Sequence, residues 1–479
     1  MKSVLKITIP FLFILLMSRG EAKDGYVQST MTRMHDPVEV PGELLSGLYG
    51  KAIPSLRLFA AKDGQMRQVV YQIDERTPEG DFVMNLGEGR DSEGDGRLDG
   101  RDLLVFRVQD SGDKAPKSMW PGDNAVEIEL VDPVDDGRSY CYLASFKAPP
   151  KRLDTRTVKL EHWDPWKRPD LPFIVTGHSY RIEGMVNEIR GKHYKTVVNE
   201  KFSMPESVGG SGENLLDGQR MRAWAELFFG SVRLDYDERS MLGGIDSLGQ
   251  GPIRGFGRQW ITVALPLGLE GPRVYSDVFT YDRVIVSPMH LNVPINPAAI
   301  ITRAGLEFGY DMNENAVGMK FYSPNCMDGV TIDGKMSEIE ENISDEWVPW
   351  YLITGPQGSL IFRVDIDERL LEQMDARLTY IDDLDFKNPP EDNPGAIGYT
   401  RTTIEVDSVK PARYDFSIEW YFPPDFYREG GYDEAALQEF LNIKDAPLVI
   451  RSGGSEAVNR ALGPPPIKAS SMWSGLQQQ

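Results

Sequence analysis

Apolar and polar residues alternate with a period of two along much of this 479-residue chain. Such alternation is typical of β-strands, because successive side chains of a strand point to opposite faces of its sheet. Clusters of Gly, Pro, Asn and Asp separate the runs, as between antiparallel strands, whereas parallel strands need a crossover of about a dozen residues. The clearest runs are residues 66–73, 103–108, 125–131, 140–146, 221–234, 260–265, 283–286, 359–364, 402–406 and 414–421. The chain is therefore predicted to be mostly β, with two or three antiparallel β-sandwich-like domains.

Helical periodicity is confined to a few short segments. In residues 433–444, apolar side chains recur on one helical face at Ala436, Leu437, Phe440 and Leu441. Residues 336–343 and 368–374 carry shorter versions of this pattern. The sandwiches are thus expected to carry few short helices.

Proline-rich and glycine-rich stretches divide the chain. The sequence Lys-Ala-Pro-Pro-Lys-Arg at 147–152 is typical of a linker and ends a predicted N-terminal β domain at residues 23–148. A second proline-rich stretch at 293–297 separates a central β domain, 155–295, from a C-terminal β domain, 298–450. Alternatively, these two parts form one large sandwich. The glycine- and proline-rich end, 452–479, is predicted to be a flexible tail.

The first 22 residues have the pattern of a secretory signal peptide. Lys2 and Lys6 precede a mainly apolar run at 7–17, and Gly20 and Ala22 provide small residues before Lys23. A membrane anchor is the alternative, but a span needs about 20 apolar residues. No later segment is that long. The mature protein is therefore expected to be periplasmic or secreted, without an integral membrane span after cleavage.

Charge excludes one large class of partners. The chain has 52 basic and 73 acidic residues, which gives a formal net charge of −21. Such a chain repels phosphate backbones and lacks the basic footprint of a nucleic-acid-binding protein. In an oxidising compartment, Cys141 and Cys326 can form one disulfide, or they can remain two buried free thiols.

Residues 91–102 carry the most specific spacing in the chain. A calcium loop of 12 residues supplies oxygens from positions 1, 3, 5, 7, 9 and 12, with Gly at position 6 for a sharp turn. Gly96 occupies position 6, and Leu98 provides an apolar residue at position 8. The predicted ligands are Asp91, Glu93, Asp95, the carbonyl of Arg97, Asp99 and Asp102.

This segment resembles the EF-hand loop and, with Asp at position 12, the dockerin variant of it. The resemblance covers these 12 residues alone and implies calcium as the bound ion. The flanks differ from the family, because Gly87 and Gly89 precede the loop and the predicted strand 103–108 follows it. We therefore expect a calcium loop between strands, with a solvated acidic turn as the alternative.

A second candidate site lies at residues 161–166, where two indoles stand beside carboxylates. Glu161, Trp163, Asp164 and Trp166 form a mixture suited to stacking on sugar rings and hydrogen-bonding their hydroxyls. The alternative is that the tryptophans pack between domains. No serine-hydrolase elbow, zinc-protease motif or P-loop spacing occurs in the chain.

The sequence thus favours an exported, calcium-stabilised β-sandwich protein. Its partner would be a glycan or another cell-envelope component, bound without catalysis. Two alternatives stay open: an enzyme acting on polysaccharide, either a lyase or a glycoside hydrolase, and a subunit of an exported complex. An enzyme of this kind would need two carboxylates about 5 to 9.5 Å apart.

Overall fold

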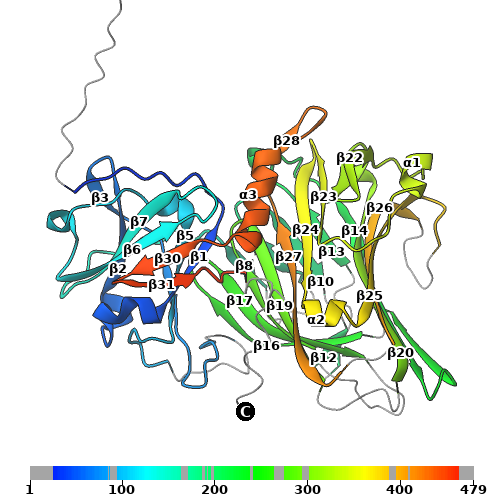
Figure 1. Ribbon diagram of the computed structural model, residues 1–479, viewed down its shortest axis with the longest axis horizontal. Coiled ribbons are helices and arrows are strands. Elements are labelled where there is room, and N and C mark those ends of the chain that lie inside the picture. Colours follow the sequence, from blue (N-terminus) through cyan, green and yellow to red (C-terminus); the bar gives the residue numbers. More distant parts are fainter. Residues whose placement is uncertain are drawn as a thin grey trace, which may run out of the picture.

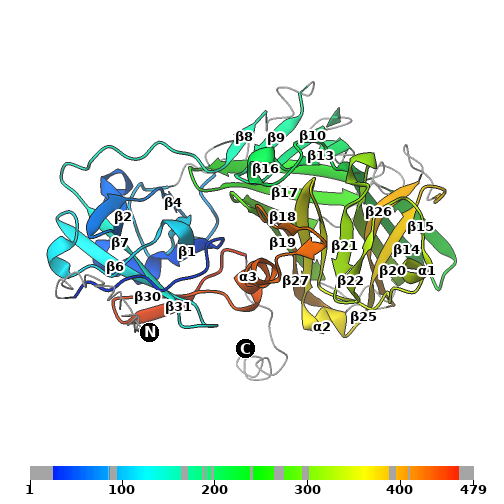
Figure 2. The same cartoon turned by 90° about the horizontal axis from the view of Figure 1, so that it is seen from above.

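The computed structural model describes residues 25–84, 86, 94–162, 171–185, 189–190, 193–195, 199–237, 241–263, 274–293, 301–387, 395–407 and 410–462. Antiparallel sheets make up most of it, so the predicted fold class is confirmed (Figure 1). Eight of the ten alternating runs overlap a single strand. The run 66–73 instead spans parts of β3 (Gln65–Gln68) and β4 (Gln72–Asp74), and the run 221–234 spans parts of β14 (Leu216–Leu227) and β15 (Val232–Asp237) with the turn between them. The two views show a smaller module, residues 25–151 with 446–462, beside a large sandwich that takes in most of residues 157–445 (Figure 2).

Two sheets form the smaller module. The first contains, in order, β3 (Gln65–Gln68), β2 (Leu56–Lys62), β7 (Arg138–Ser145), β6 (Asn124–Val131), β30 (Val449–Ser452) and β31 (Ser455–Val458). The second contains β1 (Pro37–Pro41), β5 (Leu103–Arg107) and β4 (Gln72–Asp74). Fully buried side chains such as Val40, Phe106, Ile128 and Leu143 belong to one apolar core that both sheets share. The opposite faces of β5 and β7 are covered as well, because Val105 and Tyr142 are buried in neighbouring clusters.

The end of the chain returns to this smaller module. Strand β30 pairs with β6, matching Val449 with Val131, and β31 pairs with β30. The prediction of a flexible tail from residue 452 is therefore wrong for residues 452–458, which form strands. Residues 463–479 lie outside the described part of the chain.

One broad sheet runs across the large sandwich. In order it contains β11 (Ile189–Arg190), β12 (His193–Lys195), β16 (Met241–Gln250), β17 (Gly255–Val263), β18 (Val274–Thr280), β19 (Val284–Val293), β27 (Ala412–Tyr421), β24 (Gly358–Ile366), β23 (Trp350–Gly355), β21 (Lys320–Ser323) and β22 (Cys326–Thr331). Strand β19, from the predicted central domain, pairs with β27, from the predicted C-terminal domain. Strands of the two segments therefore share one sheet, as in the alternative of one large sandwich.

Two further sheets complete the large sandwich. One contains β15 (Val232–Asp237), β14 (Leu216–Leu227), β20 (Ile301–Met312), β26 (Ala396–Val406) and β25 (Met374–Asp383). The other contains β13 (Asn199–Ser203), β10 (Arg181–Met185), β9 (Phe173–Thr176) and β8 (Lys159–Glu161). All three sheets contribute to one core, with Phe202 from β13, Phe308 and Tyr310 from β20, and Phe362 from β24. A small ribbon, β28 (Tyr427–Arg428) with β29 (Gly431–Tyr432), follows β27.

The predicted helices are present, and the longest one bridges the modules. They are α1 (Glu338–Glu341), α2 (Glu368–Leu371) and α3 (Glu434–Asp445), with 3-10 turns at Gly42–Leu48, Ile53–Ser55, Val108–Asp110, Lys117–Met119, Glu206–Val208 and Glu314–Ala316. The Asp433 side chain caps α3 by accepting a hydrogen bond from the Ala436 amide. Phe440 of α3 packs in an apolar cluster that includes Phe82 and Val105 of the smaller module and Phe279 of the sandwich. This shared cluster fixes the two modules against each other.

Two expectations from the sequence concern thiols and membrane spans. Cys141 on β7 and Cys326 on β22 are both free thiols, and they lie in different modules. The disulfide is therefore absent. Of the two buried free thiols that were the alternative, Cys141 is buried and Cys326 is half-buried. Within the described residues, no helix combines the length and the apolar character needed to cross a membrane.

Candidate functional site

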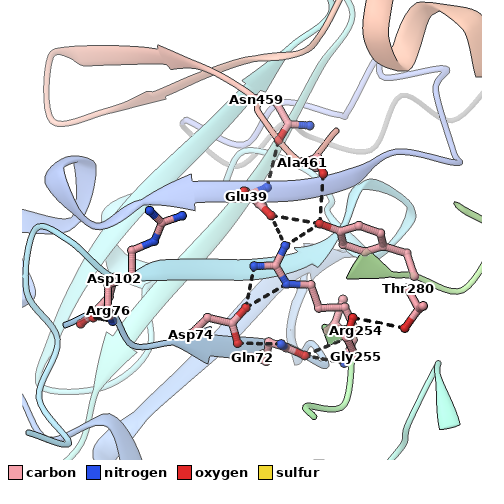
Figure 3. A network of polar contacts seen from close by, with 12 residues as sticks. Glu39, Gln72, Asp74, Arg76, Asp102, Arg254, Gly255, Thr280, Asn459 and Ala461 are labelled. Carbon is pink, nitrogen blue, oxygen red and sulfur yellow. Dashed lines mark hydrogen bonds and ion pairs between the residues drawn. The ribbon is translucent and has the colours of Figure 1, made fainter. Parts of the chain in front are cut away.

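A completely buried arginine lies where the two modules meet. Arg254, just before β17, directs its guanidinium into the smaller module (Figure 3). Its Nε atom donates to Asp74 of β4 at 2.9 Å, and Nη1 donates to Glu39 of β1 and to the Tyr281 hydroxyl at 2.6 Å. Burial by itself lowers the pKa of Arg254, but the charges of Glu39 and Asp74 outweigh it and raise the pKa above its usual value. The guanidinium is therefore a charged, paired group in the interior.

Neighbouring residues hold this arrangement in place, and together they form what we call the Arg254 network. The Gln72 side chain accepts the amides of Ile253 and Arg254 at 3.0 and 2.9 Å, and it donates to Asp74 at 2.7 Å. The returning C-terminal segment also joins, since the Tyr281 hydroxyl lies 3.2 Å from the Ala461 carbonyl oxygen. The members are Glu39, Gln72, Asp74, Arg254, Tyr281, Asn459 and Ala461.

The Arg254 network is enclosed by aromatic rings. The guanidinium carbon lies 4.6 Å from the centroid of Phe279 and 5.5 Å from that of Phe82. Cation–π contacts of this kind stabilise a desolvated guanidinium. Because every member named above is inaccessible or nearly so, the network is suited to holding the modules together and not to turning over a substrate.

In the described part of the acidic loop, residues 94–102, Gly96 and Leu98 have the local geometry that the sequence predicts. Gly96 has a φ of +68°, the left-handed conformation needed for the sharp turn at position 6. Leu98 is fully buried in the core of the smaller module. The amides of Ile53 and Gly50 bond to the carbonyls of Gly96 and Leu98, on either side of Arg97. Of the six predicted ligands, Asp91 and Glu93 lie outside the described residues.

Asp102 is the most constrained carboxylate of this loop. It is buried, and its two oxygens accept the amides of Arg76 at 3.1 Å and Asp99 at 2.8 Å. Burial raises the pKa of Asp102 to about 6, and the charges of Asp99 and Glu75 add to the increase. Repulsion among these carboxylates is the physical reason to expect a cation beside them.

The other described members of the loop are more exposed. Asp95 accepts the Arg97 amide at 2.8 Å, and Asp99 forms an ion pair with Arg101 at 2.5 Å. Hydrogen bonding to Arg101 lowers the pKa of Asp99. Among the described residues, no group of three or more His, Cys, Asp or Glu side chains is already arranged to hold a metal ion. A cation would have to draw Asp99 away from Arg101.

Sequence reasoning missed Glu75, which approaches the loop from outside it. Its Oε1 atom accepts the Gly96 amide at 2.7 Å. Glu75 belongs to the segment 72–76, whose earlier members Gln72 and Asp74 contact Arg254 and whose last member, Arg76, contacts Asp102. The acidic loop and the Arg254 network are therefore joined through five consecutive residues (Figure 3).

The predicted aromatic site is described only at its first residue. Glu161 ends strand β8 and pairs with Lys159 at 2.7 Å. Hydrogen bonding to Lys159 lowers the pKa of Glu161. Trp163, Asp164 and Trp166 lie outside the described residues. The proposed sugar-stacking pair thus stays a prediction.

A further carboxylate, which the sequence did not single out, points toward the sandwich core. Glu200 on β13 shares its strand face with buried Phe202, lies opposite Gly184 of β10 and is itself half-buried. Burial raises the pKa of Glu200 to about 7. Burial likewise raises the pKa of Tyr310, and the charge of Glu200 adds to that increase. The Tyr310 ring packs against Phe362 and Trp420, with centroids 5.6 and 6.3 Å away. Glu200 is thus a carboxyl group that changes its protonation state near neutral pH, well above the ordinary range of a glutamate.

Comparison with known proteins gives no assignment. No family model matches the sequence, and no curated protein matches it. Among solved structures, α-N-acetylgalactosaminidase NagBb from Bifidobacterium bifidum in complex with GalNAc is similar with a TM-score of 0.32 and 10% identity, over 56% of this chain and 38% of that one. The same enzyme in complex with Gal-NHAc-DNJ gives a TM-score of 0.28 and 9% identity, over 53% and 36%. The chain spans little more than a third of that enzyme, and likeness this distant assigns no function.

Proposed function

We propose that this chain is an exported, calcium-stabilised β protein that binds a glycan or another envelope component without catalysing a reaction. The observation that carries the calcium part is the segment 72–76, which contacts the acidic loop at one end and Arg254 at the other. An ion bound in the loop would therefore brace the strand that holds the module junction. Export follows from the signal-like residues 1–22, which lie outside the described part of the chain.

The described residues fit a calcium ion in part. Asp95, Asp99, Asp102 and the carbonyl of Arg97 would hold it, together with Asp91 and Glu93, and all offer the oxygen ligands that calcium prefers. The ion would supply charge neutralisation to the crowded carboxylates. Its role in this proposal is structural, since the buried Asp102 is tied to two backbone amides.

Calcium is expected to raise the melting temperature of the mature protein by about 4 °C. A site of the weaker class, with a dissociation constant of roughly 10⁻⁴ M, gains about 1.4 kcal/mol from ~1 mM calcium. Each kcal/mol corresponds to about 2 to 4 °C for a domain of this size class. Thermal melts monitored by circular dichroism, with calcium and with chelator, measure the shift.

The Asp95→Ala variant should lose this calcium response. Asp95 is exposed and accepts only the Arg97 amide among the described contacts, so its loss should leave the fold intact. Asp135→Ala is the matched control, because exposed Asp135 accepts the Gly137 amide at the same 2.8 Å in a turn outside the loop. Equal melts with calcium and with chelator in the wild type would remove the metal from the proposal.

Glycan binding is tested separately by screening the mature protein on a glycan array, with and without calcium. Binding that is lost in Trp163→Ala or Trp166→Ala, with unchanged melting, is the expected result, because indoles stack on sugar rings. If the mature protein binds no glycan on the array, every carbohydrate proposal for this chain is contradicted.

Glu200 favours a second candidate function, an enzyme acting on polysaccharide. A carboxyl group whose pKa is raised to about 7 by burial has the protonation state of a general acid near neutral pH. Such an enzyme needs a second carboxylate about 5 to 9.5 Å away. Release of products from array glycans by the wild type, abolished in Glu200→Gln, would favour this candidate over a binding protein.

A further inference from the structure

The hairpin formed by β14 and β15 ends in an exposed aromatic turn, residues 227–232, which we call the hairpin tip. Phe228 is 55% exposed, Phe229 is 93% exposed and Val232 is 42% exposed. Seen from above, β14 and β15 lie at the end of the long axis opposite the smaller module (Figure 2). Large apolar side chains are thus presented at one extremity of the molecule.

The backbone of the hairpin tip is strained. Phe228 and Phe229 have φ values of +51° and +61°, and Gly230 follows at +79°. The left-handed region is disfavoured for residues with a Cβ atom, and a bulky residue there is a genuine outlier. Asn or Gly would suit these two positions better, so the phenylalanines oppose the local conformational preference. Strain of this kind concentrates at functional positions.

The base of the hairpin is rigid. The Trp224 indole of β14 lies across Gly305 of β20, where an added Cβ would come within 2.4 Å of the ring nitrogen. Arg233 and Arg303 stack on this ring, with their guanidinium carbons 4.5 and 5.4 Å from its centroid. The Phe229 amide also donates to the Thr302 hydroxyl at 2.9 Å. The phenylalanines are therefore displayed from a fixed support.

Charges beside the hairpin tip are internally paired. Arg233 pairs with Glu226 at 3.2 Å and with Asp235 at 2.9 Å. Arg303 pairs with Glu405 at 2.7 Å and with Asp407 at 3.5 Å. Two arginines thus face four carboxylates, which leaves an acidic rim. Together with the net charge of −21, this rim disfavours an anionic surface.

We propose that Phe228 and Phe229 insert into the interfacial region of a zwitterionic lipid bilayer. A stable protein interface buries about 800 Å² on each partner, and two partly exposed phenylalanines supply roughly 300 Å². A protein partner would therefore also have to contact the arginines and carboxylates of the rim, which are already paired with each other. A bilayer can take up a narrow apolar tip without a surface of matching shape. Binding by one such element is weak and reversible, comparable to that of a single acyl chain.

Cosedimentation with phosphatidylcholine vesicles tests the proposal. The wild type should partition into the pellet, and the Phe228→Asn/Phe229→Asn double variant should partition at least ~10-fold less, because each buried Phe contributes about one order of magnitude. The double variant should also melt at the same temperature or slightly higher, because Asn tolerates the left-handed conformation. Ile339→Asn, which removes a side chain 70% exposed on α1, is the matched control and should partition like the wild type.

The inference is independent of the proposed function, because the hairpin tip and the acidic loop lie in different modules. Vesicle binding should be equal with calcium and with chelator. Equal partitioning of the wild type and the double variant would overturn the inference. So would a melting temperature several degrees lower in the double variant, since the phenylalanines would then serve the fold. Self-association without lipid that disappears in the double variant would show a protein contact instead.

Discussion

Replacing Arg254 with methionine is expected to lower the free energy of unfolding by about 3 to 5 kcal/mol. The substitution removes the cation that pairs with Asp74 and Glu39, which are buried beside it. Two carboxylates would then stay in the interior without a counter-charge, and the Tyr281 hydroxyl would lose its arginine donor. Urea unfolding followed by circular dichroism measures the effect. Because the network lies between the modules, we also expect the smaller module and the sandwich to unfold in separate transitions.

Arg258→Met is the matched control for this substitution. Arg258 lies on β17, four residues further along the chain, and pairs with Asp277 at 2.9 Å and with Asp81 at 3.1 Å. These pairs are partly exposed to solvent, so their loss should cost less than about 1 kcal/mol. Equal destabilisation by the two methionine variants would contradict a special role for Arg254. Adding Asp74→Leu and Glu39→Leu to Arg254→Met should restore much of the lost stability, because no buried charge is then left unpaired.

Much of the fold was predictable because its signals are local. The run 414–421 alternates so regularly that β27 could be placed within a few residues, and the mostly apolar run 359–364 placed β24, which pairs with it. The pairing of Val449 with Val131 could not be predicted, since it joins positions more than 300 residues apart and involves short strands. Strand pairing of this kind depends on tertiary packing, and no hydrophobic periodicity in the sequence identifies the partner strand.

The candidate sites also differ in whether their residues lie close together in the sequence. In the acidic loop, Gly96 has the turn conformation and Leu98 the buried position that their places in the 12-residue spacing indicate, while calcium binding by the loop stays a prediction. The Arg254 network could not be predicted, since its members come from residues 39, 72–74, 254, 281 and 459–461. Arg254 itself stands in the turn between β16 and β17, and its neighbours in the sequence give no sign of its distant partners. Glu75 approaches the loop only in three dimensions.

The pH dependence of stability should be controlled in part by Glu200. The pKa of Glu200 is about 7 in the folded protein, against an ordinary value of 4.5 in the unfolded chain. Between these values the folded state binds more protons than the unfolded state, so stability falls as pH rises from about 4.5 to 7. Glu200→Gln removes a group that is costly to ionise. The variant should therefore be more stable than the wild type by on the order of 3 kcal/mol at pH 8, and equally stable at pH 4.

Urea unfolding of both proteins across this pH range measures the difference, and Glu206→Gln is the control because Glu206 is exposed in the 3-10 turn after β13. If the free energy of unfolding changes with pH by the same amount in the wild type and in Glu200→Gln, ionisation of Glu200 does not destabilise the folded state.

The expected gain in stability has a further consequence. A carboxyl group that weakens the fold at neutral pH is best explained by a role outside folding, because function commonly retains groups that stability alone would replace.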